Sequence, residues 1–531
     1  MGMFVLSFSP FGYDGILIRV EADIRRGIPG IDITGLAAGA VREARERVRV
    51  AFRNSGFDFP NDRILINLAP AGIRKDGAAL DLPIALAVMA ACGIAPPALN
   101  TMVLGELELS GRIRPVRAVL AATAAGLGAG IRDFIVPAEN YAEAAILAKG
   151  NIAGVSTLEE AVQVLQRRAE TGHFYDNNTC DSAFTSQNGA AENKAQTCGD
   201  FKEVRGQGRY KRILEIAAAG AHNLLVFGPP GAGKTMLAQR LPSIMAPLSP
   251  HEQVVVTRLH SLGNLQPTRL ITQPPFRSPH HTSSVEGLVG GGKTVRPGEI
   301  SLAHKGVLFL DEAPQFHLNV LQGLREPLEE RVITITRAET VVRLPADFQL
   351  LLAANPCPCG RLGQKKSTHS GDGGYKSDAS CFCSGDEIYR YWRRFGGALL
   401  DRIELRAAVN IPSGDVLLGD TEEPSSVIAE RVLNAVKIQR GRFGTSVGIS
   451  RNAGMSAAMV EEFCKLTPSG KKAMSTCIEK LCLSGRAYHG VLRVARTIAD
   501  LEGKDIIEDA HILEAVQHRR QGDDPYDVFS V

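Results

Sequence analysis

The segment Phe227–Thr235 constrains the fold of this chain more than any other, because its glycines, lysine and threonine have the spacing of a phosphate-binding loop. The apolar run Asn223–Val226 precedes the loop, and a helical pattern follows over Met236–Leu241. This order of strand, glycine-rich loop and helix is the context in which such a loop binds phosphate. The sequence therefore predicts that the chain binds a nucleoside triphosphate.

The residues of the loop have distinct expected roles. Glycines let backbone N–H groups turn toward phosphate oxygens, and the following helix directs its positive end at the same charge. We expect Lys234 to reach the β- and γ-phosphates of ATP and Thr235 to bind Mg2+ through its hydroxyl group. The predicted nucleotide-binding residues are Gly228, Pro229, Pro230, Gly231, Ala232, Gly233, Lys234, Thr235 and Met236.

The composition is that of an ordinary cytoplasmic protein that does not enter a membrane. A net charge of +3 favours neither nucleic acid nor lipid as a global partner, so any basic binding site must be local. The uncharged run Leu82–Leu99 contains three prolines and predicts a buried helix in place of a membrane span. Ten cysteines scattered in so large a chain favour a reducing compartment, with clustered thiols serving a metal.

The chain is too long for one hydrophobic core and divides into blocks. Residues 1–170 alternate strand-like and helical patterns, 171–200 have the polar composition of a flexible linker, and 201–415 alternate again around the phosphate-binding loop. In the block with the phosphate-binding loop, this alternation predicts an α/β fold with a parallel sheet. Residues 416–531 form a helical block, with helices expected at Ser425–Arg440, Ser456–Lys465, Gly470–Ser484, Ala487–Glu502 and Ile507–Arg519.

Two further apolar strands end in residues that suit ATP hydrolysis. Val307–Leu310 leads into Asp311 and Glu312, which fit a carboxylate near Mg2+ and a carboxylate that activates the attacking water. Leu350–Ala354 leads into Asn355, whose amide is suited to sensing the γ-phosphate. An acidic strand end also occurs on ordinary surfaces, and Asn355 also suits the turn before the next proline.

Two arginines are candidates for the same reaction. Arg402 follows an apolar element and is suited to reach the γ-phosphate of a neighbouring subunit in a ring. Arg493 lies in the helical block and is suited to contact the nucleotide as part of a lid. Helix arginines are usually solvated, so a solvated side chain is the alternative for each of them.

Together these motifs resemble the ComM/YifB family, a group of Mg-chelatase-like AAA+ ATPases. The other matching segments are Gly206-Gln207, Phe276–Ser283, Arg296–His304, Asn355–Gly360 and Arg486–His489. The resemblance implies a homohexameric ring that uses ATP and Mg2+ and, in the ComM branch, drives branch migration of incoming single-stranded DNA during natural transformation. It assigns Asn355 as sensor 1, Arg402 as arginine finger and Arg493 as sensor 2, with Arg486 as the alternative for sensor 2.

The first block resembles the α+β domain of Lon proteases over Arg74–Gly77 and Gly105–Pro115. Lon-type proteolysis needs a serine nucleophile after the first motif and a lysine base after the second. Here Ala78-Ala79 and Val119-Leu120 occupy those places. We therefore expect a scaffold or a module that binds DNA or a partner, and not a protease.

Two close cysteine pairs form a candidate zinc site. Cys357 and Cys359 make one pair, and Cys381 and Cys383 make the other, which gives the four thiolates of a tetrahedral site. The intervening segment Arg361–Ser380 is longer than the resemblance implies. The alternative is four reduced cysteines without a metal.

DNA-binding residues are expected in two segments. Phe276–His304 is rich in glycine and contains Lys293 and Arg296, which suits a loop that projects into a ring pore. Arg331–Arg343 alternates like a β-hairpin and resembles the hairpin that presents a basic residue to DNA in ring helicases, with Arg337 as the candidate. A solvated strand face is the alternative for this segment.

The sequence leaves two functional classes open. The first is an ATP-driven motor that acts on single-stranded or branched DNA, as a helicase in recombination. The second is a chelatase-like ATPase that remodels a protein partner, because magnesium chelatase subunits share the core motifs.

Overall fold

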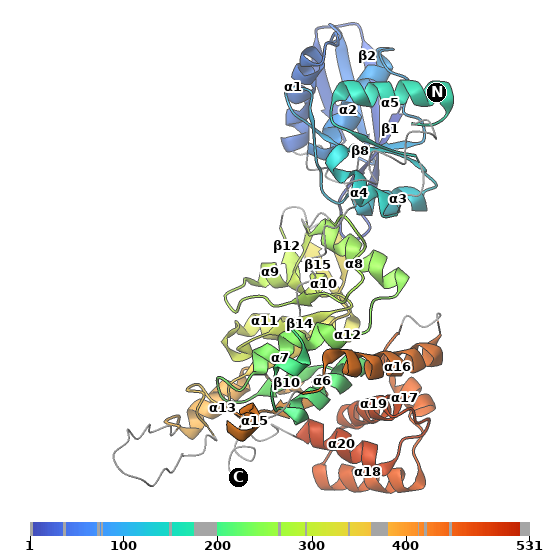
Figure 1. The fold of residues 1–531 in the computed structure, drawn as a ribbon. Helices are drawn as coiled ribbons and strands as arrows, with labels where there is room; N and C mark the ends of the chain where they lie inside the picture. Colours follow the sequence, from blue (N-terminus) through green and yellow to red (C-terminus); the bar gives the residue numbers. More distant parts are fainter. Residues whose placement is uncertain are drawn as a thin grey trace.

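The computed structural model describes residues 4–35, 39–71, 75, 78–147, 151–174, 199–263, 267–292, 295–337, 340–362, 381–412, 414–418, 422–444 and 449–520. Most of the expected linker at 171–200 therefore lies outside the described residues. Figure 1 shows an N-terminal domain at one end of the molecule, an ATPase domain in the middle and a helical region beside it.

The N-terminal domain is built on a seven-stranded mixed sheet with the order β3-β4-β2-β1-β5-β8-β9. Its strands are β1 (Phe4–Ser9), β2 (Ile16–Arg25), β3 (Gly30–Thr34), β4 (Arg63–Ala69), β5 (Thr101–Val103), β8 (Asp133–Pro137) and β9 (Asn151–Val155). Its helices are α1 (Gly39–Asn54), α2 (Asp81–Ala91), α3 (Val119–Gly128), α4 (Tyr141–Ala145) and α5 (Leu158–Thr171), and a small ribbon joins β6 (Glu106–Leu107) to β7 (Ile113–Arg114). The domain has the α+β architecture that the resemblance to Lon proteases implies.

Helix α2 confirms the expectation of a buried helix in the long uncharged run. All of its residues from Asp81 to Ala90 are buried, and the carboxylate of Asp81 accepts a 2.8 Å hydrogen bond from Arg47 of α1. The described residues contain no helix with the length and apolarity that a membrane crossing needs.

The positions that would carry a Lon-type dyad hold apolar side chains. Ala78 and Ala79 lie in the short 3-10 helix before α2. Val119 and Leu120 begin α3 and are fully buried. The lack of protease activity stays a prediction from the sequence.

The ATPase domain contains a five-stranded parallel sheet with the order β11-β14-β17-β10-β18. Its strands are β10 (Leu224–Phe227), β11 (Phe276–Arg277), β14 (Val307–Leu310), β17 (Gln349–Ala354) and β18 (Leu405–Ala408). The helices around it include α6 (Gly208–Gly220), α7 (Lys234–Arg240), α8 (Pro250–Leu262), α11 (Leu318–Gly323), α12 (Arg325–Glu330), α13 (Gly385–Arg393), α14 (Gly397–Leu400) and α15 (Gly414–Leu418). Because all five strands run the same way, the loops after β10, β14 and β17 meet at one edge of the sheet.

Two hairpins project from this domain. The first joins β15 (Val332–Arg337) to β16 (Thr340–Pro345), which confirms the hairpin that the alternation predicts. The second, smaller one joins β12 (Gly290–Gly291) to β13 (Arg296–Pro297), between α9 (Val285–Val289) and α10 (Glu299–Leu302).

The C-terminal block is helical, as predicted, and packs on the ATPase domain. It comprises α16 (Ser425–Phe443), α17 (Ala457–Phe463), α18 (Pro468–Leu481), α19 (Gly485–Leu501) and α20 (Asp509–Arg520). One continuous apolar core runs from α6 and the sheet into α16, α19 and α20. The helices are therefore held to the sheet by a shared core.

Helix α8 carries one of the contacts between the N-terminal and ATPase domains. Arg258 forms a 3.3 Å ion pair with Asp14 and lies over the ring of Tyr13. One turn later, the hydroxyl of Ser261 donates a 2.5 Å hydrogen bond to Glu143 of α4. In Figure 1 these elements face each other where the two domains meet.

Candidate nucleotide site and arginine pocket

The phosphate-binding loop lies between β10 and α7, and its glycines are required by its geometry. Gly231 and Gly233 have φ angles of 79° and 81°, in the left-handed region that glycine tolerates best. A Cβ atom on Gly228 would lie 2.1 Å from the carbonyl oxygen of Val409. The loop therefore keeps its shape only with glycine at these positions.

The ammonium group of Lys234 is directed into the loop. Its Nζ donates to the carbonyl oxygens of Gly228 at 2.6 Å and Pro229 at 2.9 Å, and to Oδ1 of Asn355 at 3.2 Å. Burial among these mostly neutral acceptors lowers the pKa of Lys234 to about 8. Phosphate oxygens are stronger acceptors than neutral carbonyls, so the lysine is placed to exchange them for a bound nucleotide.

The candidate magnesium ligands contact each other directly. The hydroxyl of Thr235 donates a 2.7 Å hydrogen bond to Oδ2 of Asp311, and the backbone N–H of Glu312 donates to Oδ1 of the same carboxylate at 2.9 Å. Glu312 turns away from the strand with a φ of 49°, and it is exposed. This geometry fits Asp311 and Thr235 as ligands of Mg2+ and leaves the carboxylate of Glu312 available to a water molecule.

Asn355 lies beside the lysine at the end of β17. Its side-chain oxygen accepts from Lys234, and its backbone N–H lies 3.3 Å from the hydroxyl of Tyr391 in α13. The strand order explains this contact, because β17 lies between β10 and β14. Among the predicted site residues, the structure brings the loop, Asp311, Glu312 and Asn355 together.

Two residues without a predicted role support the loop from behind. The side-chain amide of Gln207 donates to the carbonyl oxygens of Ala232 at 3.0 Å and Asn410 at 2.6 Å. The buried hydroxyl of Tyr210 lies 3.3 Å from the carbonyl oxygen of Lys234. Gly206-Gln207 stood among the matching segments, but no local pattern connects it to a loop that begins some twenty residues later.

Arg402 lies at the opposite edge of the sheet from the phosphate-binding loop. It precedes β18, which pairs in parallel with β10 through Leu224 and Leu405. Four strand residues at about 3.3 Å each separate the two edges by about 13 Å. Arg402 is therefore directed away from the nucleotide site of its own chain.

The predicted arginines meet in one cavity at this amino edge. The cavity has a volume of about 280 Å3, and its charged lining comprises Glu329, Arg331, Asp401, Arg402, Glu404, Arg486, Arg493 and Arg519. We call it the arginine pocket. Glu329 forms ion pairs with Arg402 at 2.6 Å and with Arg486 at 2.5 Å. The hydrogen bond from Arg402 is the main cause that lowers the pKa of Glu329.

Arg493 joins the helical block to the sheet. Its Nε lies 3.2 Å from Oε1 of buried Glu404, and its Nη1 donates to the carbonyl oxygen of Ala453 at 2.9 Å. Glu404 also pairs with His222 at 2.6 Å, and the other ring nitrogen of that histidine lies 2.7 Å from the hydroxyl of Thr497. The structure thus places the sensor 2 candidate in the arginine pocket, away from the loop of its own chain.

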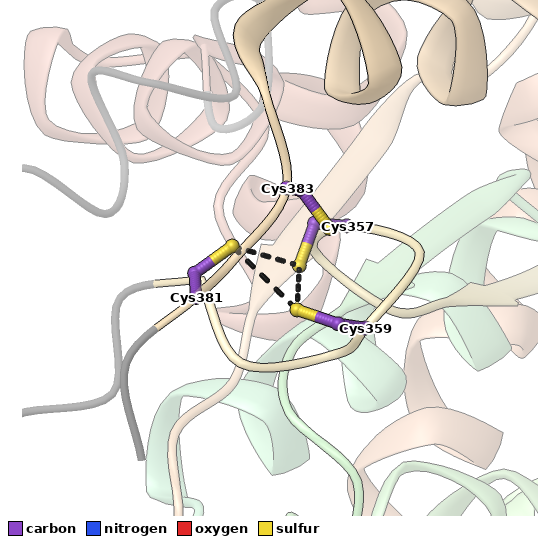
Figure 2. A group of neighbouring side chains, drawn as sticks. All are labelled: Cys357, Cys359, Cys381 and Cys383. Atoms are coloured by element: carbon purple, nitrogen blue, oxygen red, sulfur yellow. Dashed lines mark hydrogen bonds between the residues drawn. The ribbon is translucent and has the colours of Figure 1, made fainter. Parts of the chain in front are cut away.

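The four predicted zinc ligands lie together. Their sulfur atoms are all within 4.8 Å of one another, although the two pairs come from separate segments. Figure 2 shows the four side chains, with Cys357 and Cys359 in the segment 357–362, which we call the cysteine loop, and Cys381 and Cys383 just before α13.

The predicted DNA-binding residues are described in part. Lys293 lies outside the described residues, and for Arg337 only the backbone at the end of β15 is described. Arg296 lies in β13 and is exposed. Burial lowers the pKa of Arg117 in the N-terminal domain, and the charge of Arg296 lowers it further. The two guanidinium groups therefore lie near each other.

Three protein-family models match parts of this chain. The family model for magnesium chelatase subunit ChlI matches residues 200–416, the model for subunit ChlI of Mg-chelatase matches 20–140, and the ChlI C-terminal model matches 422–519. The match to 200–416 contains the phosphate-binding loop and both acidic and amide strand ends.

Full-length relatives specify the family further. Competence protein ComM of Haemophilus influenzae is 37% identical over 520 residues, which cover 97% of each chain. YifB of Escherichia coli is 36% identical over 513 residues, or 94% of each chain. Lon protease 2 of Bacillus subtilis is 28% identical over 184 residues, or 30% of this chain and 33% of that protease. The chain belongs to the ComM/YifB family of Mg-chelatase-like AAA+ ATPases, and its N-terminal domain is Lon-protease-like.

Proposed function

We propose that the protein is a cytoplasmic ring motor that hydrolyses ATP and drives branch migration of DNA. The observation that supports a ring is the separation of the phosphate-binding loop from Arg402 within one chain. Each chain has its phosphate-binding loop at one edge of the sheet and Arg402 at the other. A head-to-tail interface joins such unlike edges, and repeated rotation closes it into a ring. The family resemblance favours a hexamer.

Within one protomer, each residue of the site has a separate role in ATP hydrolysis. Thr235 and Asp311 would hold Mg2+, and Lys234 would stabilise negative charge on the β- and γ-phosphates. Glu312 would accept a proton from the attacking water. Asn355 would orient the γ-phosphate next to Lys234.

Arg402 from the next protomer would complete the site. A guanidinium group placed on the γ-phosphate stabilises charge in the transition state. Nε of Arg402 is buried without a hydrogen-bond partner among the described residues, and Glu329 neutralises the group within its own chain. We infer that Arg402 leaves Glu329 for the neighbour's phosphate when the ring forms.

DNA would pass the hairpins that project toward the N-terminal domain. Arg296 on the small hairpin lies near exposed Arg117, and two nearby guanidinium groups suit a phosphate backbone. The larger hairpin, β15–β16, contacts the N-terminal domain. Val342 of β16 lies so close to Gly12 of that domain that a Cβ atom on Gly12 would be 2.8 Å from Cγ1 of Val342. We therefore assign Arg296 to the DNA path, and Lys293 and Arg337 stay DNA-binding predictions from the sequence.

The competence protein among the relatives supports DNA as the substrate, and the ChlI family models support the alternative of a protein partner. Strand displacement on a four-way DNA junction distinguishes the two. We expect ATP-dependent displacement by the wild-type protein and none by Lys234→Ala. ATP turnover without displacement on forked, four-way and single-strand invasion substrates would favour the protein-remodelling function.

A further inference from the structure

The cysteine cluster has the dimensions of a metal site. The sulfur of Cys357 lies 3.3 Å from that of Cys359 and 3.6 Å from that of Cys381, and the Cys359–Cys381 distance is 3.5 Å. Zinc–sulfur bonds of about 2.3 Å in a tetrahedron place sulfurs about 3.8 Å apart, whereas a disulfide needs about 2.05 Å. Figure 2 shows three sulfurs directed at a common point with Cys383 beside them.

Two backbone N–H groups are directed at a sulfur of the cluster. The N–H groups of Arg361 and Leu362 donate to the sulfur of Cys357. Such donors stabilise and orient metal-bound thiolates. Four cysteines fill every position of a tetrahedral zinc ion, so the site would be structural and would not perform chemistry.

The two cysteine pairs belong to elements that also meet at the nucleotide site. The first pair directly follows Asn355-Pro356, and the second leads into α13. Helix α13 returns to the strand end, where the indole N–H of Trp392 donates to the carbonyl oxygen of Pro356 at 3.0 Å. Tyr391 approaches the backbone N–H of Asn355. A metal would therefore join two chain segments that both contact Asn355, the sensor 1 candidate, or the residue after it.

The cysteine loop also touches the phosphate-binding loop. A Cβ atom on Gly360 would lie 2.9 Å from Cδ of Pro230, and the φ of 75° at this position also favours glycine. The Trp392 ring packs edge-on against Phe227, which ends β10, at 5.4 Å between centroids. The phosphate-binding loop thus contacts residues next to the cluster at two points, Phe227 at its start and Pro230 within it.

We propose that Cys357, Cys359, Cys381 and Cys383 bind one Zn2+, and that this ion clamps Asn355 and the phosphate-binding loop in the geometry that holds the nucleotide. The effect of the ion on Asn355 and the loop, which we call the clamp, rests on the proposed nucleotide site. Metal binding by the four cysteines does not depend on that site. The clamp acts through position alone, because the ion touches no phosphate.

Metal content tests the site itself. We expect about one zinc per full-length chain by elemental mass spectrometry, and at least tenfold less in the double variant Cys381→Ser/Cys383→Ser. Cys482→Ser is the matched control, since this exposed cysteine lies outside the cluster. Stoichiometric iron, or wild-type protein that neither contains zinc nor takes it up under reducing conditions, would overturn the proposal.

Trp392 is the only tryptophan of the chain and reports on the clamp directly. Removing zinc from the wild-type protein with a chelator should shift its emission to longer wavelength and weaken ATP binding about tenfold, and added zinc should reverse both changes. The reversibility guards against a variant that misfolds. Unchanged emission and unchanged affinity after complete zinc removal would refute the clamp. An emission change in a protein that binds no nucleotide would instead refute the proposed function.

Discussion

The two edges of the five-stranded sheet differ in chemistry although the same strands supply both. At the carboxyl edge, β10, β14 and β17 end in a glycine loop, two carboxylates and an amide, and Lys234 donates hydrogen bonds to the loop and to the amide. At the amino edge, the chain before β18 and the helices α12 and α19 gather guanidinium groups around Glu329 and Glu404. The first edge is suited to hold Mg-ATP, and the second is suited to approach its phosphates.

The charges of the two edges are balanced in different ways. Lys234 faces neutral carbonyls and an amide, so burial lowers its pKa to about 8. Arg402 instead has a carboxylate partner, Glu329, which it shares with Arg486. Among the described residues, the hydrogen bonds of the lysine go to neutral acceptors, and Asp311 and Glu312 act on it only as nearby charges, whereas the arginine must leave a direct carboxylate partner to act elsewhere. Replacing residues at each edge separates these roles.

The largest effect is expected at the amino edge. Arg402→Ala should lower kcat for ATP hydrolysis about 10³-fold, because an arginine supplied by a neighbour stabilises the transition state by that order. The Kd of the nucleotide should change little, because the finger acts mainly on charge that develops in the transition state, and the loop that holds the ground-state nucleotide is intact. Steady-state turnover and equilibrium binding of a fluorescent nucleotide measure the two.

Arg486→Ala is the informative control for this variant, because both arginines contact Glu329. A larger loss of kcat in Arg486→Ala than in Arg402→Ala would transfer the role of the finger to Arg486.

A smaller effect is expected from pH at the carboxyl edge. Phosphates favour the protonated form of Lys234, so the bound pKa exceeds the free value of about 8. Below that value affinity is constant, and above it the Kd should rise about tenfold per pH unit. Titrations between about pH 7 and pH 9.5 test this, and Lys234→Arg should remove the dependence because guanidinium stays charged. A nucleotide Kd of the wild-type protein that stays constant over this pH range would contradict a pKa of about 8 for Lys234 in the nucleotide-free protein.

The smallest effect is expected at Glu329. Its side chain is partly exposed, and such ion pairs contribute about 0–1 kcal/mol. Glu329→Gln releases Arg402 without removing it, so kcat should rise by no more than about threefold. Turnover measured over a range of protein concentrations checks this. A tenfold loss would mean that Glu329 itself takes part in hydrolysis.

The sequence was sufficient for the parts of the site that local patterns determine. Asp311 and Asn355 could be predicted because each ends an apolar strand, and the loop could be predicted from its spacing. The helices of the C-terminal block followed from apolar periodicity.

The positions of the arginines relative to the phosphate-binding loop could not be predicted from the sequence, because they depend on strand order and on contacts between distant segments. Arg402 precedes its strand and Asn355 follows its own, but only the parallel pairing of β18 with β10 places them at opposite edges. The carboxylates of Glu329 and Glu404 that hold the arginines come from unrelated segments. Helical spacing likewise could not show that Arg493 joins the sheet to the helical block.

The central claim is that each active site is shared between two chains, and mixing two inactive variants tests it most directly. Lys234→Ala lacks a working loop but keeps Arg402, and Arg402→Ala has the reverse defect. In equimolar mixed rings half of the loops are intact and half of the fingers are intact, so about one quarter of the wild-type ATPase activity should return. Mixed rings that stay as inactive as either variant alone would contradict a site shared between chains.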